Sequence, residues 1–170
     1  MRAGVDERPE FDEEEPGPTE AGAAGAWMRA STRELLDALR ASPADAPAWT
    51  WWDEPRTAGA IGRHQVQEAA VHRWDAQSAL GVPEPLRAAL ADDGVEEFLE
   101  ISRQMRPPTP ITFEATDTGR AFTLSDREPA VTVSAPSGDL VLLLYRRLSP
   151  DQVRVDGDRA VLDEFLAPIE

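Results

Sequence analysis

Glu68 and His72 are the pair of side chains in this sequence best suited to bind a metal ion. They stand four positions apart in a stretch with helical periodicity, so one turn of helix brings both to the same face. There a carboxylate oxygen and an imidazole nitrogen can converge on one divalent ion. The same pair can instead form an ordinary hydrogen bond facing solvent, and the spacing leaves both interpretations open.

His64 and Asp75, from the same stretch, extend the candidate site. His64 lies on the same helical stripe, but a regular helix separates it from His72 by about 12 Å of rise, too far for one shared ion. It is therefore a weaker ligand candidate. Asp75 follows His72 by three positions, where it can orient the imidazole ring as a hydrogen-bond acceptor. Alternatively, it can pair with Arg73 or Arg56.

The candidate site belongs to the second of three helical stretches. We expect these over about residues 27–42, 57–80 and 85–106, from the spacing of their apolar residues. In the second stretch Thr57 is a suitable N-cap, and Gly81 followed by Pro83 is a suitable stop. In the third, the segment Asp92-Asp93-Gly94 can break or re-cap the helix. Three prolines just beyond residue 106 then mark an abrupt boundary.

Beyond these prolines the apolar period changes to that of strands. Residues 111–115 alternate, and Asp117-Thr118-Gly119 is typical of a hairpin turn that leads into a second strand at 121–124. Further elements are expected as a strand at 130–134, an apolar helix at 140–148 opened by Ser137-Gly138-Asp139, a strand at 153–155 and a last helix capped by Asp158. The pattern predicts an α+β fold, with a helical part followed by a small α+β part.

The composition limits which partners the protein can have. Its 170 residues carry 32 acidic and 17 basic side chains, a net charge of −15. Such a balance argues against nucleic acid as a partner, because no basic stripe faces the phosphates. No apolar run approaches the ~18 residues of a membrane span, and no charged-then-apolar leader opens the sequence. We therefore expect a cytoplasmic protein with a small-molecule substrate or ligand and no membrane association.

Three residue types are missing altogether: cysteine, lysine and asparagine. Without cysteine the chain has no disulfide, no thiolate metal ligand and no sulfur nucleophile of its own. Because lysine and asparagine use A-rich codons, their absence indicates a G+C-rich coding sequence.

The stretch Glu68-Ala-Ala-Val-His72-Arg-Trp-Asp75-Ala resembles the mycothiol-dependent maleylpyruvate isomerase family, part of the DinB-like metal-binding superfamily. The likeness continues through Leu80-Gly-Val-Pro83 and Ala91-Asp-Asp-Gly94-Val-Glu-Glu-Phe98-Leu. It extends to Ser137-Gly-Asp139-Leu-Val-Leu-Leu-Leu144-Tyr-Arg146-Arg147 and Val155-Asp-Gly157-Asp158, and so covers roughly residues 26–166.

The resemblance implies a divalent metal, usually zinc, held by Glu68 and His72 as the family's E-x-x-x-H pair. It also implies mycothiol as co-substrate, whose thiol the metal activates for addition to a cis-enoyl acid and isomerisation of its double bond. Arg147, or its neighbour Arg146, is the counterpart of an arginine thought to assist substrate binding in the family. Mycothiol belongs to actinobacteria, whose genomes are typically G+C-rich, in keeping with the missing residue types.

The sequence departs from the family at its start. Family members begin with a long helix bearing a third, histidine ligand, and no histidine precedes His64 here. We therefore expect either a shortened homologue or a chain whose start is incomplete, with weaker metal binding than a three-ligand site has. A homodimer that supplies the missing helix from a second copy is a further interpretation.

The expected organisation has three parts. They are an acidic, disordered arm over residues 1–24, an incomplete DinB-like bundle over 25–106 and a sterol-carrier-like α+β subdomain over 107–170. Like charges repel and little can be buried in the arm. A second functional hypothesis is a non-catalytic module whose α+β half binds a small molecule or serves as a scaffold. An apolar groove beside Leu140–Leu144 would favour it.

Overall fold

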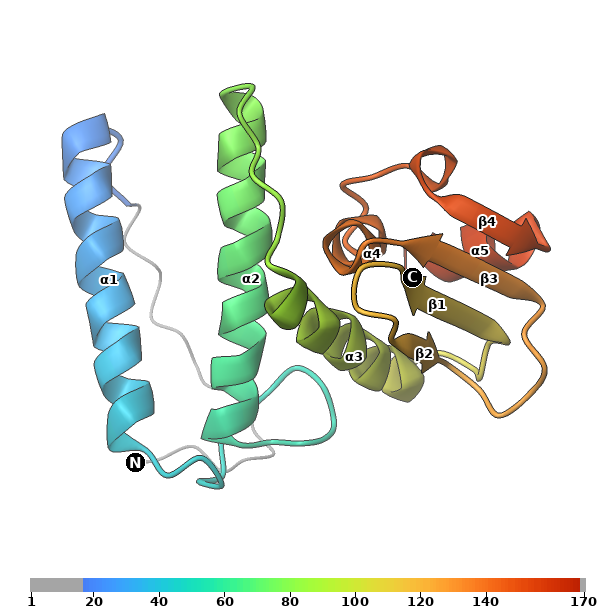
Figure 1. The fold of residues 1–170 in the computed structure, drawn as a ribbon. Coiled ribbons are helices and arrows are strands. Elements are labelled where there is room, and N and C mark those ends of the chain that lie inside the picture. The colour runs from blue at the N-terminus through green and yellow to red at the C-terminus, as the bar shows by residue number, and fades with distance from the viewer. Residues whose placement is uncertain (1–16, 169–170) are drawn as a thin grey trace. The chain divides into compact units, whose positions relative to one another are not determined.

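The computed structural model describes residues 17–168 (Figure 1). The elements in that range are α1 (Ala21–Ala41), α2 (Ala58–Ala79), α3 (Ala88–Met105), β1 (Ile111–Ala115), β2 (Ala121–Thr123), β3 (Val131–Ala135), α4 (Ser137–Leu144), the 3-10 helix η1 (Pro150–Gln152), β4 (Arg154–Gly157) and α5 (Arg159–Leu166). Five α-helices and four strands in this order make an α+β fold with a helical N-terminal part, as the sequence predicted.

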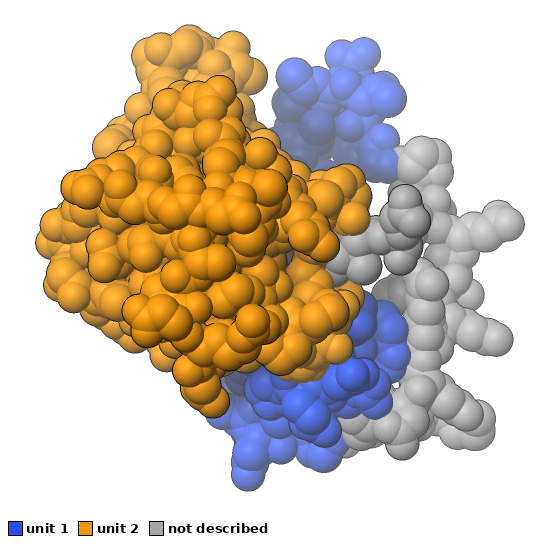
Figure 2. All heavy atoms as spheres, turned by 90° about the vertical axis from the view of Figure 1, so that its right-hand side faces the viewer, with its two compact units in different colours: residues 1–65 blue, residues 66–170 orange. Residues whose placement is uncertain are grey.

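Two compact units divide the chain after Gln65 (Figure 2). The first holds α1 and the beginning of α2, and the second holds the rest of α2 and all later elements. The three-part organisation expected from the sequence stays a prediction. Most of the expected arm, residues 1–24, lies outside the described residues, and its last four belong to α1. That helix begins six positions before Trp27 because its first turns consist of alanine and glycine, which give no apolar period although alanine favours helix strongly.

The second unit is built on a four-stranded mixed sheet with the strand order β2-β1-β3-β4. β1 and β2 form the expected antiparallel hairpin, β3 runs parallel to β1, and β4 is antiparallel to β3. Alternate residues of β1 and β3 are buried, so one face of the sheet joins the core. On that face Phe113 of β1 meets Phe165 of α5, with ring centroids 6.1 Å apart.

α4 is the most buried helix among the described elements. Its segment Leu140–Leu144 is 0–3% exposed and packs with α3 and the sheet. The segment is therefore core, and the hypothesis of a ligand-binding or scaffold module in this half stays a prediction. α4 also ends earlier than residue 148, because the backbone turns into a left-handed conformation at Arg146.

α3 positions α2, the helix of the candidate site. It begins at Ala88, three residues later than expected, and runs unbroken through Asp92-Asp93-Gly94. A Cβ atom on Gly94 would lie 2.2 Å from Oε1 of Gln67, a buried side chain of α2 that donates to the carbonyl oxygen of Leu90 at 3.2 Å. Here glycine allows two helices to approach closely instead of ending a helix. None of the helices in residues 17–168 is long and apolar enough to cross a membrane.

Candidate functional site

α2 presents Glu68 and His72 on one face, as their spacing predicted. The His72 Nε2 atom lies 3.3 Å from Oε2 of Glu68. The His72 side chain is 62% exposed and that of Glu68 33%, so the pair is open to solvent on one side. Both residues lie within the regular helix α2 (Ala58–Ala79), so their placement requires no unusual backbone conformation. Thr57 caps the N-terminus of this helix, because its hydroxyl accepts a hydrogen bond from the Ala60 amide at 3.2 Å.

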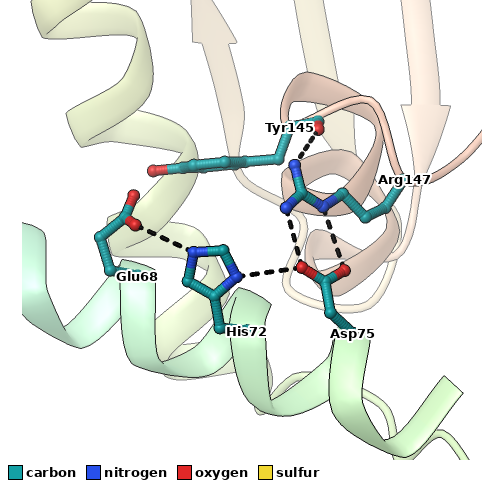
Figure 3. Close-up of polar contacts among 5 residues, drawn as sticks. All are labelled: Glu68, His72, Asp75, Tyr145 and Arg147. Atoms are coloured by element: carbon teal, nitrogen blue, oxygen red, sulfur yellow. Dashed lines mark hydrogen bonds and ion pairs between the residues drawn. The ribbon is translucent and has the colours of Figure 1, made fainter. Parts of the chain in front are cut away.

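Asp75 connects His72 to Arg147, which follows α4 (Figure 3). Its carboxylate lies 3.1 Å from His72 Nδ1 and accepts two hydrogen bonds from Arg147, from Nε at 3.1 Å and from NH2 at 2.8 Å. Of the partners considered from the sequence, Arg73 pairs instead with Glu84 at 3.0 Å. Asp75 therefore orients the imidazole ring and is itself held by a bidentate arginine.

The pairing of Asp75 with Arg147 shifts the pKa values of these two groups in opposite directions. The hydrogen bonds from Arg147 lower the pKa of the Asp75 carboxyl, outweighing a smaller opposite effect of burial, and the bond to His72 acts in the same direction. The same pairing with Asp75 raises the pKa of the Arg147 guanidinium. Both groups are thus fixed in their charged forms at neutral pH.

This network assigns the proton of a neutral His72 to Nδ1, where it is donated to Asp75, and leaves the lone pair of Nε2 facing Glu68. The ring can then do either of two things. A protonated ring donates to both carboxylates as an ion pair, and a neutral ring offers Nε2 to a cation shared with Glu68. Because Asp75 and Glu68 face opposite nitrogens, Asp75 cannot ligate the same ion.

Two ligand atoms about 2.0–2.1 Å from a tetrahedral zinc ion lie about 3.3 Å apart. The 3.3 Å between His72 Nε2 and Glu68 Oε2 matches that spacing, so these two atoms fit one edge of such a site. A third protein ligand is not beside them: within residues 17–168, no three or more histidine and carboxylate side chains are grouped so that they could hold a metal ion. His64 lies in the first unit, where its ring centroid is 5.8 Å from that of Trp51 and 5.1 Å from that of Trp52.

Tyr145 is a neighbour of this group that the sequence did not reveal. Its ring lies over the polar cluster with the hydroxyl on the Glu68 side, and its carbonyl oxygen accepts from NH1 of Arg147 at 2.7 Å (Figure 3). Burial, and then the charges of Glu97 and Glu68, raise the pKa of the Tyr145 hydroxyl far above its ordinary value. The hydroxyl therefore remains a proton donor. The sequence offered one signal for its role: Tyr145 is the single tyrosine of the chain and directly precedes two arginines.

A pocket of 690 Å³ opens beside Tyr145. Its lining residues come from α3 and from the end of α4: Phe98, Leu144, Tyr145, Arg146 and Arg147. Tyr145 and Arg147 thus belong both to the pocket wall and to the polar network around His72.

Comparison with protein families accounts for nearly the whole chain. Residues 1–77 match the mycothiol maleylpyruvate isomerase N-terminal domain, and residues 89–164 match the MDMPI C-terminal domain. The chain belongs to the mycothiol maleylpyruvate isomerase family. Glu68, His72 and Asp75 fall within the N-terminal match and Tyr145 and Arg147 within the C-terminal one, so the ion pair of Asp75 with Arg147 joins the two family domains. Neither the curated proteins nor the solved structures gave a match.

Proposed function

We propose that this member of the mycothiol maleylpyruvate isomerase family binds a divalent metal ion, zinc or a similar ion, through Glu68 and His72. The observation that carries the proposal is the 3.3 Å separation of His72 Nε2 and Glu68 Oε2. Asp75 supports it, because a hydrogen bond from Nδ1 fixes the tautomer in which Nε2 is free to ligate.

The reaction we propose is thiol-dependent isomerase or transferase chemistry in the cytoplasm. A divalent metal at such a site would lower the pKa of a bound thiol. The chain holds no cysteine, so the thiol belongs to a small co-substrate, mycothiol in this family. Arg147 acts here as a positioning residue, because its Nε and NH2 groups already donate hydrogen bonds to the Asp75 carboxylate. The Tyr145 hydroxyl is available as a donor on the Glu68 side.

Two protein ligands bind a metal ion less tightly than three, so we expect weak binding by one chain. If the Glu68–His72 pairs of two copies share one ion, one ion per two chains and a metal-dependent dimer are expected. Isothermal titration with Zn²⁺ gives the stoichiometry, and sedimentation velocity with and without Zn²⁺ gives the assembly.

The decisive test compares Co²⁺ binding, followed by its visible absorption and by calorimetry, in four proteins. Wild type and His64→Gln, the matched control at the other histidine, are expected to bind alike. Glu68→Gln and His72→Gln are each expected to weaken binding at least tenfold, because each removes a ligand of a site that has few. Equal binding by all four proteins would show that the pair is an ion pair and nothing more.

A further inference from the structure

β4 (Arg154–Gly157) lies at one edge of the sheet, whose strand order is β2-β1-β3-β4 (Figure 1). An edge strand presents a row of backbone N–H and C=O groups to which a further strand can pair. Within residues 17–168 no strand lies beyond β4. What this edge can bind therefore depends on which of its groups face outward and on the charges beside them.

The hydrogen bonds between β3 and β4 decide which backbone groups face outward. The Asp158 amide donates to the Ala130 carbonyl oxygen at 2.8 Å, so Asp158 bonds toward β3. In an antiparallel pair every second residue bonds to the partner strand, so Asp156 and Arg154 bond toward β3 as well. The N–H and C=O groups of Val155, between them, therefore point away from the sheet.

The two side chains that flank Val155 carry opposite charges. Those of Arg154 and Asp156 are 75% and 56% exposed, and they pair with each other at 2.8 Å. Val155 points to the other face, where it packs against the core. Charges on an edge strand commonly keep other strands away. Here, however, the order arginine-valine-aspartate is complementary to its own reverse, so an antiparallel copy of the same strand meets opposite charges.

Charge also selects the register of such a pair. In a symmetric antiparallel pair, one residue lies opposite its own copy at the two-fold axis. The backbone leaves the extended conformation at Gly157, where φ is +107°, so the axis can pass only near the three residues before it. Arg154 at the axis would oppose two guanidinium groups, and Asp156 would oppose two carboxylates. Both arrangements are destabilising.

Val155 at the axis avoids this conflict. Its outward N–H and C=O groups can then exchange two hydrogen bonds with those of the second Val155. Each Arg154 lies opposite an Asp156, at a position where cross-strand side chains approach most closely. The four side chains form a ring of alternating charge around the axis. This register is the one that satisfies the backbone and the charges together.

We propose that the protein forms a symmetric dimer in which β4 pairs antiparallel with β4 of a second copy, centred on Val155. The two sheets then join into one continuous sheet. The contact is short, and two chains that each carry a net charge of −15 repel, so the dimer is weak and needs salt to screen that repulsion. It requires neither metal nor thiol and goes beyond the proposed function.

The test is sedimentation velocity in EDTA and about 150 mM NaCl, at about 10–500 μM protein. Wild type is expected to change from monomer to dimer over this range. Arg154→Asp and Asp156→Arg are each expected to weaken the dimer about tenfold or more, because each places like charges opposite one another. An equal mixture of these two variants should restore a dimer, since opposite charges then meet at both positions.

Two substitutions in the loop after β2 are matched controls. Arg127→Asp and Asp126→Arg change the net charge by the same amounts at exposed positions outside β4. Both should dimerise as wild type does. Circular dichroism verifies that all four variants fold, which is expected because every substituted side chain is exposed.

Amide hydrogen exchange locates the contact. The Val155 amide is open in the monomer, and its exchange should slow as the protein concentration rises, whereas that of Arg154 is bonded to β3 and should change little. A wild type that stays monomeric, or β4 variants that dimerise as well as wild type, would overturn the proposal. A mixture that fails to restore the dimer would overturn it too, and assemblies larger than a dimer would contradict the two-fold pairing.

His72→Gln separates this dimer from the metal site. In EDTA it should dimerise as wild type does, although it is expected to lose metal affinity. A dimer that forms only with Zn²⁺ would overturn the pairing of β4 and leave the proposed metal site standing. A dimer in EDTA together with no metal binding would confirm the pairing and overturn the metal site.

Discussion

Asp75 connects the two parts of the candidate site. One carboxylate both orients the His72 ring and accepts two hydrogen bonds from Arg147, which lies 72 positions later in the chain. The side chains of Asp75 and Arg147 are 34% and 30% exposed, so the pair is neither buried nor freely hydrated. Such a bidentate pair contributes about 1 kcal/mol at most, and its main effect is to fix the direction of the imidazole ring.

Asp75→Asn should lower the free energy of unfolding at pH 7 by about 1 kcal/mol or less. Because the pKa of Asp75 is lowered in the folded state, its stabilising effect is complete above the unfolded value of about 3.9 and disappears as the pH falls through the folded value. The difference between wild type and variant should therefore shrink below about pH 4. Urea unfolding followed by circular dichroism between pH 7 and pH 2 measures this difference.

Asp163→Asn is the control for this series. It alters a pair with Arg159 in which the two side chains are 56% and 40% exposed, and it should change stability little at any pH. An Asp75→Asn effect that persists undiminished at pH 2 would mean that the carboxylate charge is not its source.

The residues of the site could be predicted only as far as local spacing reaches. Glu68 and His72 are neighbours because a helix makes them so, and the sequence identified them on that ground. The partner of Asp75 could not be found in this way, since Arg73 and Arg56 are nearer in sequence than Arg147. Only the fold of the second unit brings the end of α4 to α2. The family resemblance singled out Arg147 but not its contact.

At the level of elements, Gly94 determines how closely α2 and α3 pack. The Gln67 amide fills the space where a Cβ atom would be, with Oε1 2.2 Å and Cδ 2.6 Å from that position. Gln67 is 1% exposed and bonded to the Leu90 carbonyl oxygen, so it cannot move aside without losing a buried hydrogen bond. The position of α2, and with it that of Glu68, depends on this contact.

Gly94→Ala is therefore expected to destabilise the protein by about 1–3 kcal/mol, although alanine is the better helix former. In a Gln67→Ala background the same change should instead stabilise by up to about 1 kcal/mol, because the space is free and only helix propensity remains. Urea unfolding of the wild type, the two single variants and the double variant measures this change of sign. Simple additivity of the two substitutions would show that they do not contact each other.

The ends of α4 show why some helix boundaries escape sequence analysis. Pro136 precedes the helix and has no side chain that could cap it; Asp117, in the turn between β1 and β2, accepts the Ser137 amide at 2.8 Å instead. That hydrogen bond is the chief cause of the lowered pKa of the Asp117 carboxyl. At the other end Arg146 adopts the conformation of a glycine. The first feature is tertiary, and the second is a local helix end that no glycine marks in the sequence. The strands and the caps at Thr57 and Asp158, by contrast, follow from local residues and were predicted.

On the scale of the whole molecule, charge is the dominant feature. The net charge of −15 means that folding brings mutually repelling carboxylates together, against which individual ion pairs such as Asp75 with Arg147 weigh little. Salt screens this repulsion, with a Debye length of about 10 Å at 0.1 M. Added salt weakens the exposed ion pairs as well, so its net effect tells which of the two contributions is larger.

We expect repulsion to be larger, so raising NaCl from 10 to 300 mM at pH 7 should increase stability by about 1 kcal/mol, or the melting temperature by roughly 2–4 °C. Scanning calorimetry measures the shift. The control is the same salt series near pH 4.5, the isoelectric point calculated from the sequence, where net repulsion vanishes and the shift should vanish with it. A melting temperature that falls with salt at pH 7 would show instead that local ion pairs dominate, and the Asp75–Arg147 pair would then be the first to examine by substitution.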